Sequence, residues 1–238
     1  MKFLTKQWYR DMQSTDLHLL LQEDEQAAHP TEEYFQSLYA RREQEFLDYP
    51  PDEGATPDWE AQQKQQFEEA FHASLSRYIA GLPEEIKNCI PDLRLLPLYR
   101  VPPQCAEMIR RFCMEKQEAV DDAFNRYKEA LRLHFLDKSP PFMNDFYFHD
   151  GVITQVQQEG TDLILTFNLG KNCRFHDAVL LVQEKELINA VWFYDEIYPS
   201  GAGYEIHVLL CQKPFNMRDS LFEIILQCRD VSITRNDE

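Results

Sequence analysis

The 238-residue chain has little positive charge and no long hydrophobic run. Its 24 lysines and arginines are outnumbered by 41 aspartates and glutamates, which gives a formal net charge of −17. Nucleic acids and anionic lipids bind basic surfaces, so we expect neither a nucleic-acid partner nor a membrane partner. No apolar run reaches the 18 residues of a membrane-spanning helix, and residues 1–9 turn polar too early for a signal peptide. We therefore expect a cytoplasmic protein.

The cysteines lack the spacing of a metal site or a redox pair. No Cys-x-x-Cys sequence occurs, and two of the six cysteines stand in apolar, strand-like runs. Such cysteines are typical of small buried hydrophobic residues in a reducing compartment. The six are Cys89, Cys105, Cys113, Cys173, Cys211 and Cys228.

Complete catalytic motifs are missing as well. The sequence contains no P-loop, no Gly-x-Ser-x-Gly and no His-Glu-x-x-His. Residues 200–204 are glycine-rich, but they join two predicted strands, and no helix follows whose amides would hold a phosphate. Glu69 and His72 have the Glu-x-x-His spacing of di-iron bundles, but such sites need a second copy, which is absent. No cofactor is predicted from a motif.

The N-terminal part of the chain has helical periodicity. Apolar residues make up 44% of the sequence and aromatic residues 13%, which indicates a folded protein with a substantial core. Up to residue 139 the apolar residues recur at the spacing of one helix face, and prolines separate the segments. The predicted helical segments are 4–29, 31–47, 58–80 and 104–136, with Thr31 and Asp58 as N-caps and a loop at 50–57.

The C-terminal part has the period of β-strands. Residues 148–167 predict a hairpin around Gly160, because Leu163, Leu165 and Phe167 alternate with partly polar positions. Further strands are expected at 177–182, 190–198, 204–211, 221–227 and 231–234. The sequence thus predicts an α+β protein: an N-terminal helical region, 1–139, packed on a C-terminal antiparallel β-sheet or partly open barrel, 140–238.

Four short motifs resemble a known family. They are Lys-Phe-Leu-Thr-Lys-Gln-Trp-Tyr at 2–9, Leu-Pro-Glu-Glu-Ile at 82–86, Pro-Asp-Leu-Arg-Leu-Leu at 91–96 and Trp-Phe-Tyr-Asp-Glu-Ile at 192–197. Together they are similar to an uncharacterised family of bacterial cytoplasmic proteins, chiefly from Firmicutes, that is classed as a domain of unknown function. The resemblance covers nearly the whole chain. It implies a bacterial source and a helical-plus-β layout, and it transfers no catalytic residue.

Two His-Asp pairs are the candidate metal ligands. Imidazole and carboxylate groups from neighbouring strands could converge on a divalent metal. Alternatively, each aspartate is a turn residue at the start of a strand, and each histidine is a half-buried residue of the sheet. The candidate ligands are His149, Asp150, His176, Asp177 and His207.

An aromatic run supplies the candidate binding residues. Alternate members of residues 192–194 lie on opposite faces of a strand, so one set lies outside the core if only one face of the sheet is covered. Either the helical region covers that second face, or the aromatics form a recognition patch for a cationic or amphipathic partner, flanked by Asp195, Glu196 and Glu205. The candidate binding residues are Trp192, Tyr194, Tyr198 and Tyr204.

The functional prediction follows from the missing catalytic motifs and from the aromatic residues and His-Asp pairs of the β region. We expect a non-catalytic protein-binding or regulatory module, with an immunity-type protein as one form of it. Its functional surface is expected around residues 192–204 and the two His-Asp pairs. The alternatives are a metal-dependent enzyme that uses the His-Asp pairs and a scaffold in a larger assembly. The expected state is a monomer or a homodimer.

Overall fold

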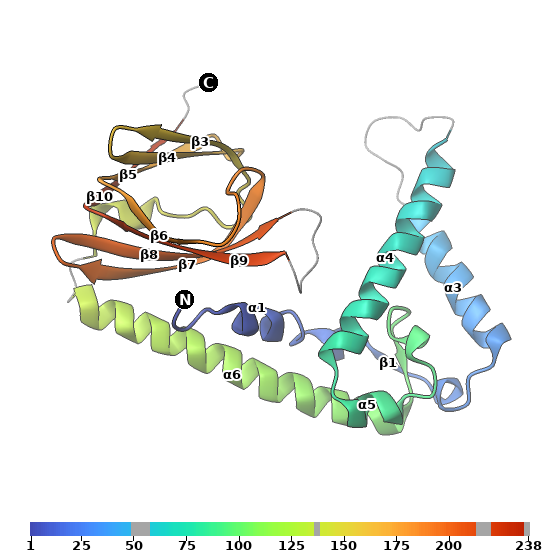
Figure 1. Ribbon diagram of the computed structural model, residues 1–238. Helices are drawn as coiled ribbons and strands as arrows, with labels where there is room; N and C mark the ends of the chain where they lie inside the picture. Colours follow the sequence, from blue (N-terminus) through green and yellow to red (C-terminus); the bar gives the residue numbers. More distant parts are fainter. Residues whose placement is uncertain (49–57, 136–138, 213–219, 236–238) are drawn as a thin grey trace. The chain divides into compact units, whose positions relative to one another are not determined.

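The computed structural model describes residues 1–48, 58–135, 139–212 and 220–235 (Figure 1). The predicted loop at 50–57 lies outside the described residues. Two compact units are present: a β unit, Met1–Met12 with Glu118–Glu238, and a helical unit, Gln13–Gln117. The two units divide inside one long helix, α6 (Pro103–Phe135).

The helical unit consists of short elements around two long helices. Thr31 caps the first of these, because its hydroxyl accepts the Tyr34 amide at 3.1 Å, as predicted. Asp58 stands at the N-cap of the second but makes no capping hydrogen bond with its side chain. The elements are α2 (Leu17–Leu20), β1 (Gln22–Glu23), η1 (Glu25–Ala28), α3 (Glu32–Leu47), α4 (Trp59–Gly81), α5 (Glu84–Cys89), η2 (Leu93–Leu95), β2 (Arg100–Val101) and the first part of α6.

A disulfide joins two parts of the helical unit. Cys89 at the end of α5 is bonded to Cys105 in the first turn of α6, and the other four cysteines are free and buried. The expectation of six buried thiols is therefore wrong for this pair. The spacing of 16 residues carries no recognisable motif, and only the packing of α5 against α6 brings the two sulfur atoms together.

The β unit contains two four-stranded antiparallel sheets whose inner faces share one core. One sheet has the order β10-β5-β4-β3 and the other β6-β9-β8-β7; within the described residues neither closes into a barrel. The largest fully buried side chains of the core include Phe148, Phe167, Phe175, Trp192 and Phe222. The strands are β3 (Ile153–Glu159), β4 (Asp162–Phe167), β5 (Lys171–His176), β6 (Val179–Gln183), β7 (Ala190–Ser200), β8 (Gly203–Gln212), β9 (Leu221–Cys228) and β10 (Asp230–Arg235), after the short helix η3 (Pro141–Asn144).

The predicted hairpin is confirmed in β3 and β4. Gly160 has a φ of +61°, a left-handed conformation that glycine adopts without steric cost. Leu163, Leu165 and Phe167 all point into the core, as their alternation predicts. The α+β class is thereby confirmed, with the strands divided between two sheets.

Helices cover the outer face of the second sheet. Trp8 and Tyr9 of α1 (Lys6–Met12) pack with Tyr127 of α6 against Phe193 and Leu209. The rings of Tyr9 and Phe193 stack at a centroid distance of 4.7 Å. Helices α1 and α6 therefore pack on the second sheet within the β unit. No helix in the described part of the chain is both long and apolar enough to cross a bilayer.

Candidate functional site

Glu196 joins two of the motifs that carry the family resemblance. Its buried carboxylate accepts the backbone N–H groups of Lys2, Phe3 and Leu4 at 2.7, 2.8 and 2.5 Å. The hydroxyl of Tyr198 donates a fourth hydrogen bond at 2.7 Å. These four hydrogen bonds compensate for the hydration that a carboxylate loses on burial. The Glu196 carboxylate therefore holds the N-terminal segment against β7. Sequence reasoning missed it, although a carboxylate inside an apolar strand was a visible signal.

The four candidate aromatic residues are buried or half-buried in the packed interior of the β unit. Trp192 is fully buried in the sandwich core, and Tyr198 is 4% exposed. Burial raises the pKa of Tyr198, and its hydrogen bond to Glu196 raises that pKa further. Tyr194 and Tyr204 are half-buried, against Trp8 and Phe142 respectively. These four residues therefore do not form one exposed patch.

The two His-Asp pairs occupy equivalent turns. In each Phe-His-Asp sequence the phenylalanine is fully buried, and the aspartate has a positive φ, +63° at Asp150 and +50° at Asp177. Aspartate tolerates this left-handed conformation better than most residues. The repeated tripeptide thus encodes a buried anchor followed by a turn, which agrees with the turn interpretation of the two aspartates.

The candidate metal ligands have separate partners. His149 pairs with Asp150 at 3.0 Å, and His207 pairs with Glu205 at 2.8 Å. His176 lies between Asp162, at 3.0 Å, and the hydroxyl of Ser232, at 2.9 Å. Asp177 instead accepts from Thr161 at 2.7 Å. Among residues that the structure describes, no group of three or more His, Cys, Asp or Glu side chains is arranged to hold a metal ion.

One His-Asp pair does meet the aromatic run. The ring of His149 lies edge-on to Tyr194 at a centroid distance of 5.1 Å. Beside them, the pKa of Asp195 is raised to about 6: burial is the main cause, the Trp192 indole N–H opposes the rise, Glu196 adds to it and His149 opposes it. A carboxyl group that titrates near neutrality marks a candidate site for pH-dependent chemistry.

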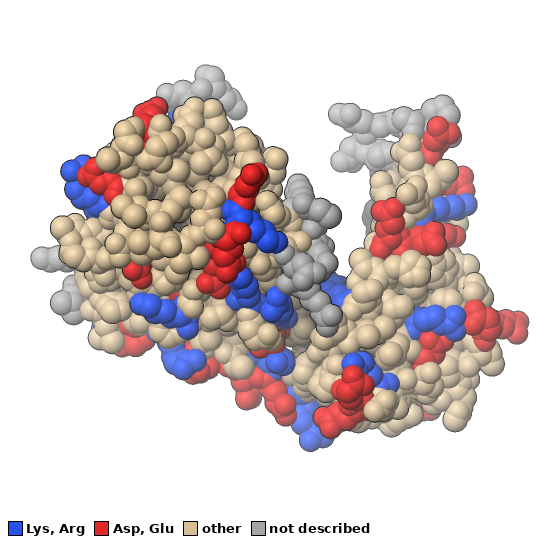
Figure 2. Space-filling model, viewed as in Figure 1, with Lys and Arg blue, Asp and Glu red and all other residues tan. Residues whose placement is uncertain are grey.

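Exposed apolar residues of the β unit lie next to one another on strand β6, at the edge of the second sheet. All four apolar residues of this strand are exposed: Val179 by 57%, Leu180 by 37%, Leu181 by 49% and Val182 by 38%. Among the strands of the described residues only β9 pairs with β6, and the register shifts between Leu180 and Val182. Figure 2 shows broad stretches of this unit's surface without acidic or basic side chains. We call this strand the β6 edge.

Sequence reasoning recognised this segment as a strand but not as an edge. A run of apolar residues without alternation is typical of a strand buried on both faces. The same run at an edge leaves both its side chains and its backbone groups available for pairing. Strand order is set by distant residues, so the local sequence could not distinguish the two cases.

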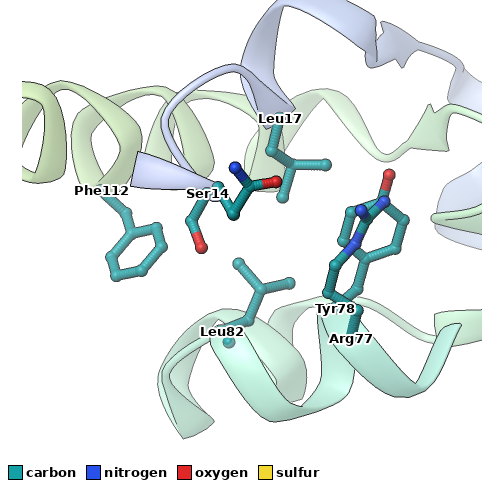
Figure 3. A pocket seen from close by; sticks show the side chains of 8 residues that line it. Ser14, Leu17, Arg77, Tyr78, Leu82 and Phe112 are labelled. Atoms are coloured by element: carbon teal, nitrogen blue, oxygen red, sulfur yellow. The ribbon is translucent and has the colours of Figure 1, made fainter. Parts of the chain in front are cut away.

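Two of the hollows in the described part of the helical unit differ in size and charge. The first is lined by Ser14, Leu17, Arg77, Tyr78, Leu82, Phe112 and two further residues (Figure 3), and its volume of about 20 Å³ has room for a single water molecule. The second is larger, about 110 Å³, and three arginines line it. The first is too small for a ligand.

Comparisons with known proteins add no assignment. None of the protein-family models, curated proteins or solved structures compared with the chain matches it. The resemblance drawn from the four motifs therefore stays a prediction. Function has to be argued from the residues of the chain itself.

Proposed function

We propose that this chain is a non-catalytic protein-binding module that engages its partner through the β6 edge of the β unit. The observation that carries the proposal is the exposure of four consecutive apolar residues on an edge strand. This keeps the predicted binding function in the β region and moves its site from residues 192–204 to residues 179–182. A regulatory or immunity-type role would act through the same surface.

The physical argument rests on how edge strands are normally protected. Proteins place lysines, prolines or strong bulges on exposed edges, because a free apolar edge recruits further strands. Residues 179–182 carry no charge and no proline, and within the described residues one register shift is the protection that this edge has. Burying the exposed halves of four such side chains contributes about 3–6 kcal/mol before the entropic cost of association. A partner strand that pairs with β6 gains this energy together with backbone hydrogen bonds.

The charge of the chain favours a basic partner. Asp177, Glu184, Lys185 and Glu186 flank the strand, and Arg229 and Lys6 pair with the first two. The preference for a basic partner therefore rests on the formal net charge of the whole chain, which is −17. Like charges would repel an acidic partner, whereas a segment with alternating apolar and basic residues would place each kind against its complement. The proposed partner is therefore a different protein with a basic, extended segment.

Site-specific photocrosslinking in cells that express the full chain tests this proposal. A photoreactive residue at position 181 should give one major adduct with another protein. The same residue at Leu133, which is 55% exposed on a helix of the same unit, should give none. Val179→Lys in the position-181 protein should remove the adduct without lowering the melting temperature, because Val179 is more than half exposed.

Three results would contradict the proposal. They are no adduct at position 181, an adduct that survives Val179→Lys, and an adduct with a second copy of this chain. In the last case the β6 edge would be a self-association surface, and a heterologous partner would be excluded as its main occupant.

We also propose that the module acts in a bacterial cytoplasm. The four buried free thiols and the family resemblance support this location. The Cys89–Cys105 disulfide would then be open for much of the time, because cytosolic disulfides are usually transient. Acid quenching of the cells, followed by alkylation of the denatured protein without reductant, should modify both cysteines. A disulfide that stays fully resistant to alkylation would place the protein in an oxidising compartment.

A further inference from the structure

The larger hollow of the helical unit is basic in an acidic protein. It lies between the C-terminal half of α3 and the segment that leads into β2. Three arginines line it and only one carboxylate does, whereas the whole chain has a formal net charge of −17. We call it the arginine hollow; its lining residues are Gln22, Leu38, Arg41, Arg42, Glu45, Leu98, Tyr99 and Arg100.

One glutamate serves two of the three arginines. Glu45 accepts from Arg42 at 2.8 Å, but its distance to Arg41 is 3.8 Å, which is too long for a hydrogen bond. A guanidinium has five N–H donors, so within the described part of the chain these contacts, and one between Arg42 and the Tyr99 side chain, leave further donors of both arginines for solvent or a ligand. The side chains of these two arginines are 57% and 42% exposed, which leaves them accessible from solvent.

The third arginine is held in place by the protein. Arg100 is 14% exposed, donates to the Tyr99 carbonyl at 3.1 Å and lies 3.6 Å from Asp24. Among the described residues these contacts use only part of its fork of donors. A half-buried and positioned arginine beside two exposed ones is an arrangement that favours binding of a multidentate anion.

A strained backbone at Tyr99 supports the same arrangement. Tyr99 has a φ of +58°, a left-handed conformation that is unfavourable for a bulky residue. In this conformation its carbonyl accepts from both Gln22 and Arg100, and its ring lies 5.0 Å from the guanidinium of Arg42. Strain of this kind persists where the surrounding structure imposes it, and it concentrates at ligand sites.

We propose that the arginine hollow binds the phosphate group of a small molecule. Three guanidiniums face two carboxylates, Glu45 in the lining and Asp24 beside Arg100, which leaves an excess of positive charge that attracts an anion. The forked N–H donors of arginine suit tetrahedral oxyanions. A volume of about 110 Å³ is well below that of pockets for drug-sized ligands, so only the phosphate and its nearest atoms would be enclosed. This site is independent of the β6 edge and lies in the other unit.

Calorimetric titration of the full chain tests the proposal at constant ionic strength. The probes are inorganic phosphate, glycerol phosphate as a simple monoester, and acetate. Binding of phosphate alone identifies the free ion as the ligand, and tighter binding of glycerol phosphate identifies a monoester; both support the site. Binding of acetate alone, or of none of the three, overturns it.

Two substitutions with opposite expected effects locate the site. Arg41→Gln should weaken phosphate binding by about tenfold or more, the loss expected for a hydrogen bond to a charged group. Glu45→Gln should instead tighten binding, because it removes the competing carboxylate and frees donors of Arg42. The matched controls are Arg110→Gln and Glu107→Gln, which alter another exposed pair three residues apart in the same unit and should leave binding unchanged.

The outcomes separate a built site from general attraction. Binding that survives Arg41→Gln, or that Arg110→Gln weakens equally, would show non-specific attraction of anions and reject the proposal. Weaker binding in Glu45→Gln would also reject it, because Glu45 would then hold the site together rather than compete with the ligand. Melting temperatures of all variants identify any that fail to fold, and Arg41, as the most exposed of the three arginines, is the substitution least expected to do so.

Discussion

The β6 edge and the arginine hollow differ in the kind of group that each leaves without a partner. On the edge, apolar side chains and backbone groups are exposed on a strand whose other side is paired with β9. In the hollow, the N–H donors of arginine side chains converge on a small space, and the protein's own carboxylates accept from only some of these donors. Apolar groups are non-directional and suit a large partner, whereas forked donors are directional and suit a small anion.

The two units also differ in how they are stabilised. The β unit has a large core between its sheets and a second core beneath α1 and α6, with a buried carboxylate that fastens the N-terminal segment. The helical unit has two smaller apolar clusters and a disulfide. Loss of one buried hydrogen-bonded group should therefore affect the β unit most, and reduction should affect the helical unit most.

The largest effect is expected for Glu196→Ala in the β unit. The substitution leaves four donors without their acceptor, each of which costs about 1–3 kcal/mol when buried. Since the N-terminal segment can detach and be rehydrated, we expect a total loss of about 3–5 kcal/mol in the free energy of unfolding. Urea unfolding measures it. Glu186→Ala, at an exposed site of the same unit, is the control. Equal stability of the two variants would contradict the claim that Glu196 holds the N-terminal segment in place.

Reduction should destabilise the helical unit. A disulfide that closes a loop of 16 residues contributes about 3 kcal/mol in the chain-entropy description. Urea unfolding of the oxidised protein with and without dithiothreitol should show a loss of this size. The Cys89→Ser protein should be insensitive to the reductant. If dithiothreitol changes both proteins alike, the effect comes from elsewhere in the chain.

Asp195 should make the stability of the β unit depend on pH. Its pKa is raised from 3.8 to about 6 by burial, so the folded state binds the proton more tightly than the unfolded state. Stability from this group is complete below pH 4 and is lost as the pH rises through about 6. Asp195→Asn does not titrate, so its stability relative to the parent should increase by about 1–3 kcal/mol between pH 4 and pH 7. A difference that is constant with pH would contradict the shifted pKa.

The smallest effect concerns the strained residue of the helical unit. Tyr99→Gly and Tyr99→Ala both remove the ring, so the difference between them reports on the backbone. Glycine accepts a positive φ, and we expect the glycine variant to be about 1 kcal/mol more stable than the alanine variant in urea unfolding. Alanine is the more stabilising residue at ordinary φ, so the reverse order would mean that position 99 is not left-handed in solution.

Local signals in the sequence predicted much of the fold. The hydroxyl of Thr31, the turn at Gly160 and the alternation at Leu163, Leu165 and Phe167 all act within a few residues, and the structure confirms each of them. The predicted segment at 4–29 was less successful, because it divides into α1, α2, β1 and η1. Its apolar residues pack into two different cores, and in the sequence the two sets together resemble the apolar face of one irregular helix.

The candidate sites were predicted less well because burial depends on distant partners. Trp192 and Tyr198 read as recognition residues, yet the opposite sheet buries one and the N-terminal segment covers the other. The arginines at 41 and 42 read as solvent-exposed charges of a helix. The arginine hollow forms because residues 98–100 fold back beside them.

By itself, the sequence determined the α+β class, the positions of most helices and strands, the turns of the two Phe-His-Asp repeats and the acidic character of the chain. These properties depend on periodicity, backbone preference and composition, which act locally. Only the tertiary structure decided that β6 is an edge, that Glu196 binds the N-terminal amides, that Cys89 reaches Cys105 and that three arginines share one hollow. Each of these pairs residues far apart in the chain, where free energy depends on packing rather than on neighbours in sequence.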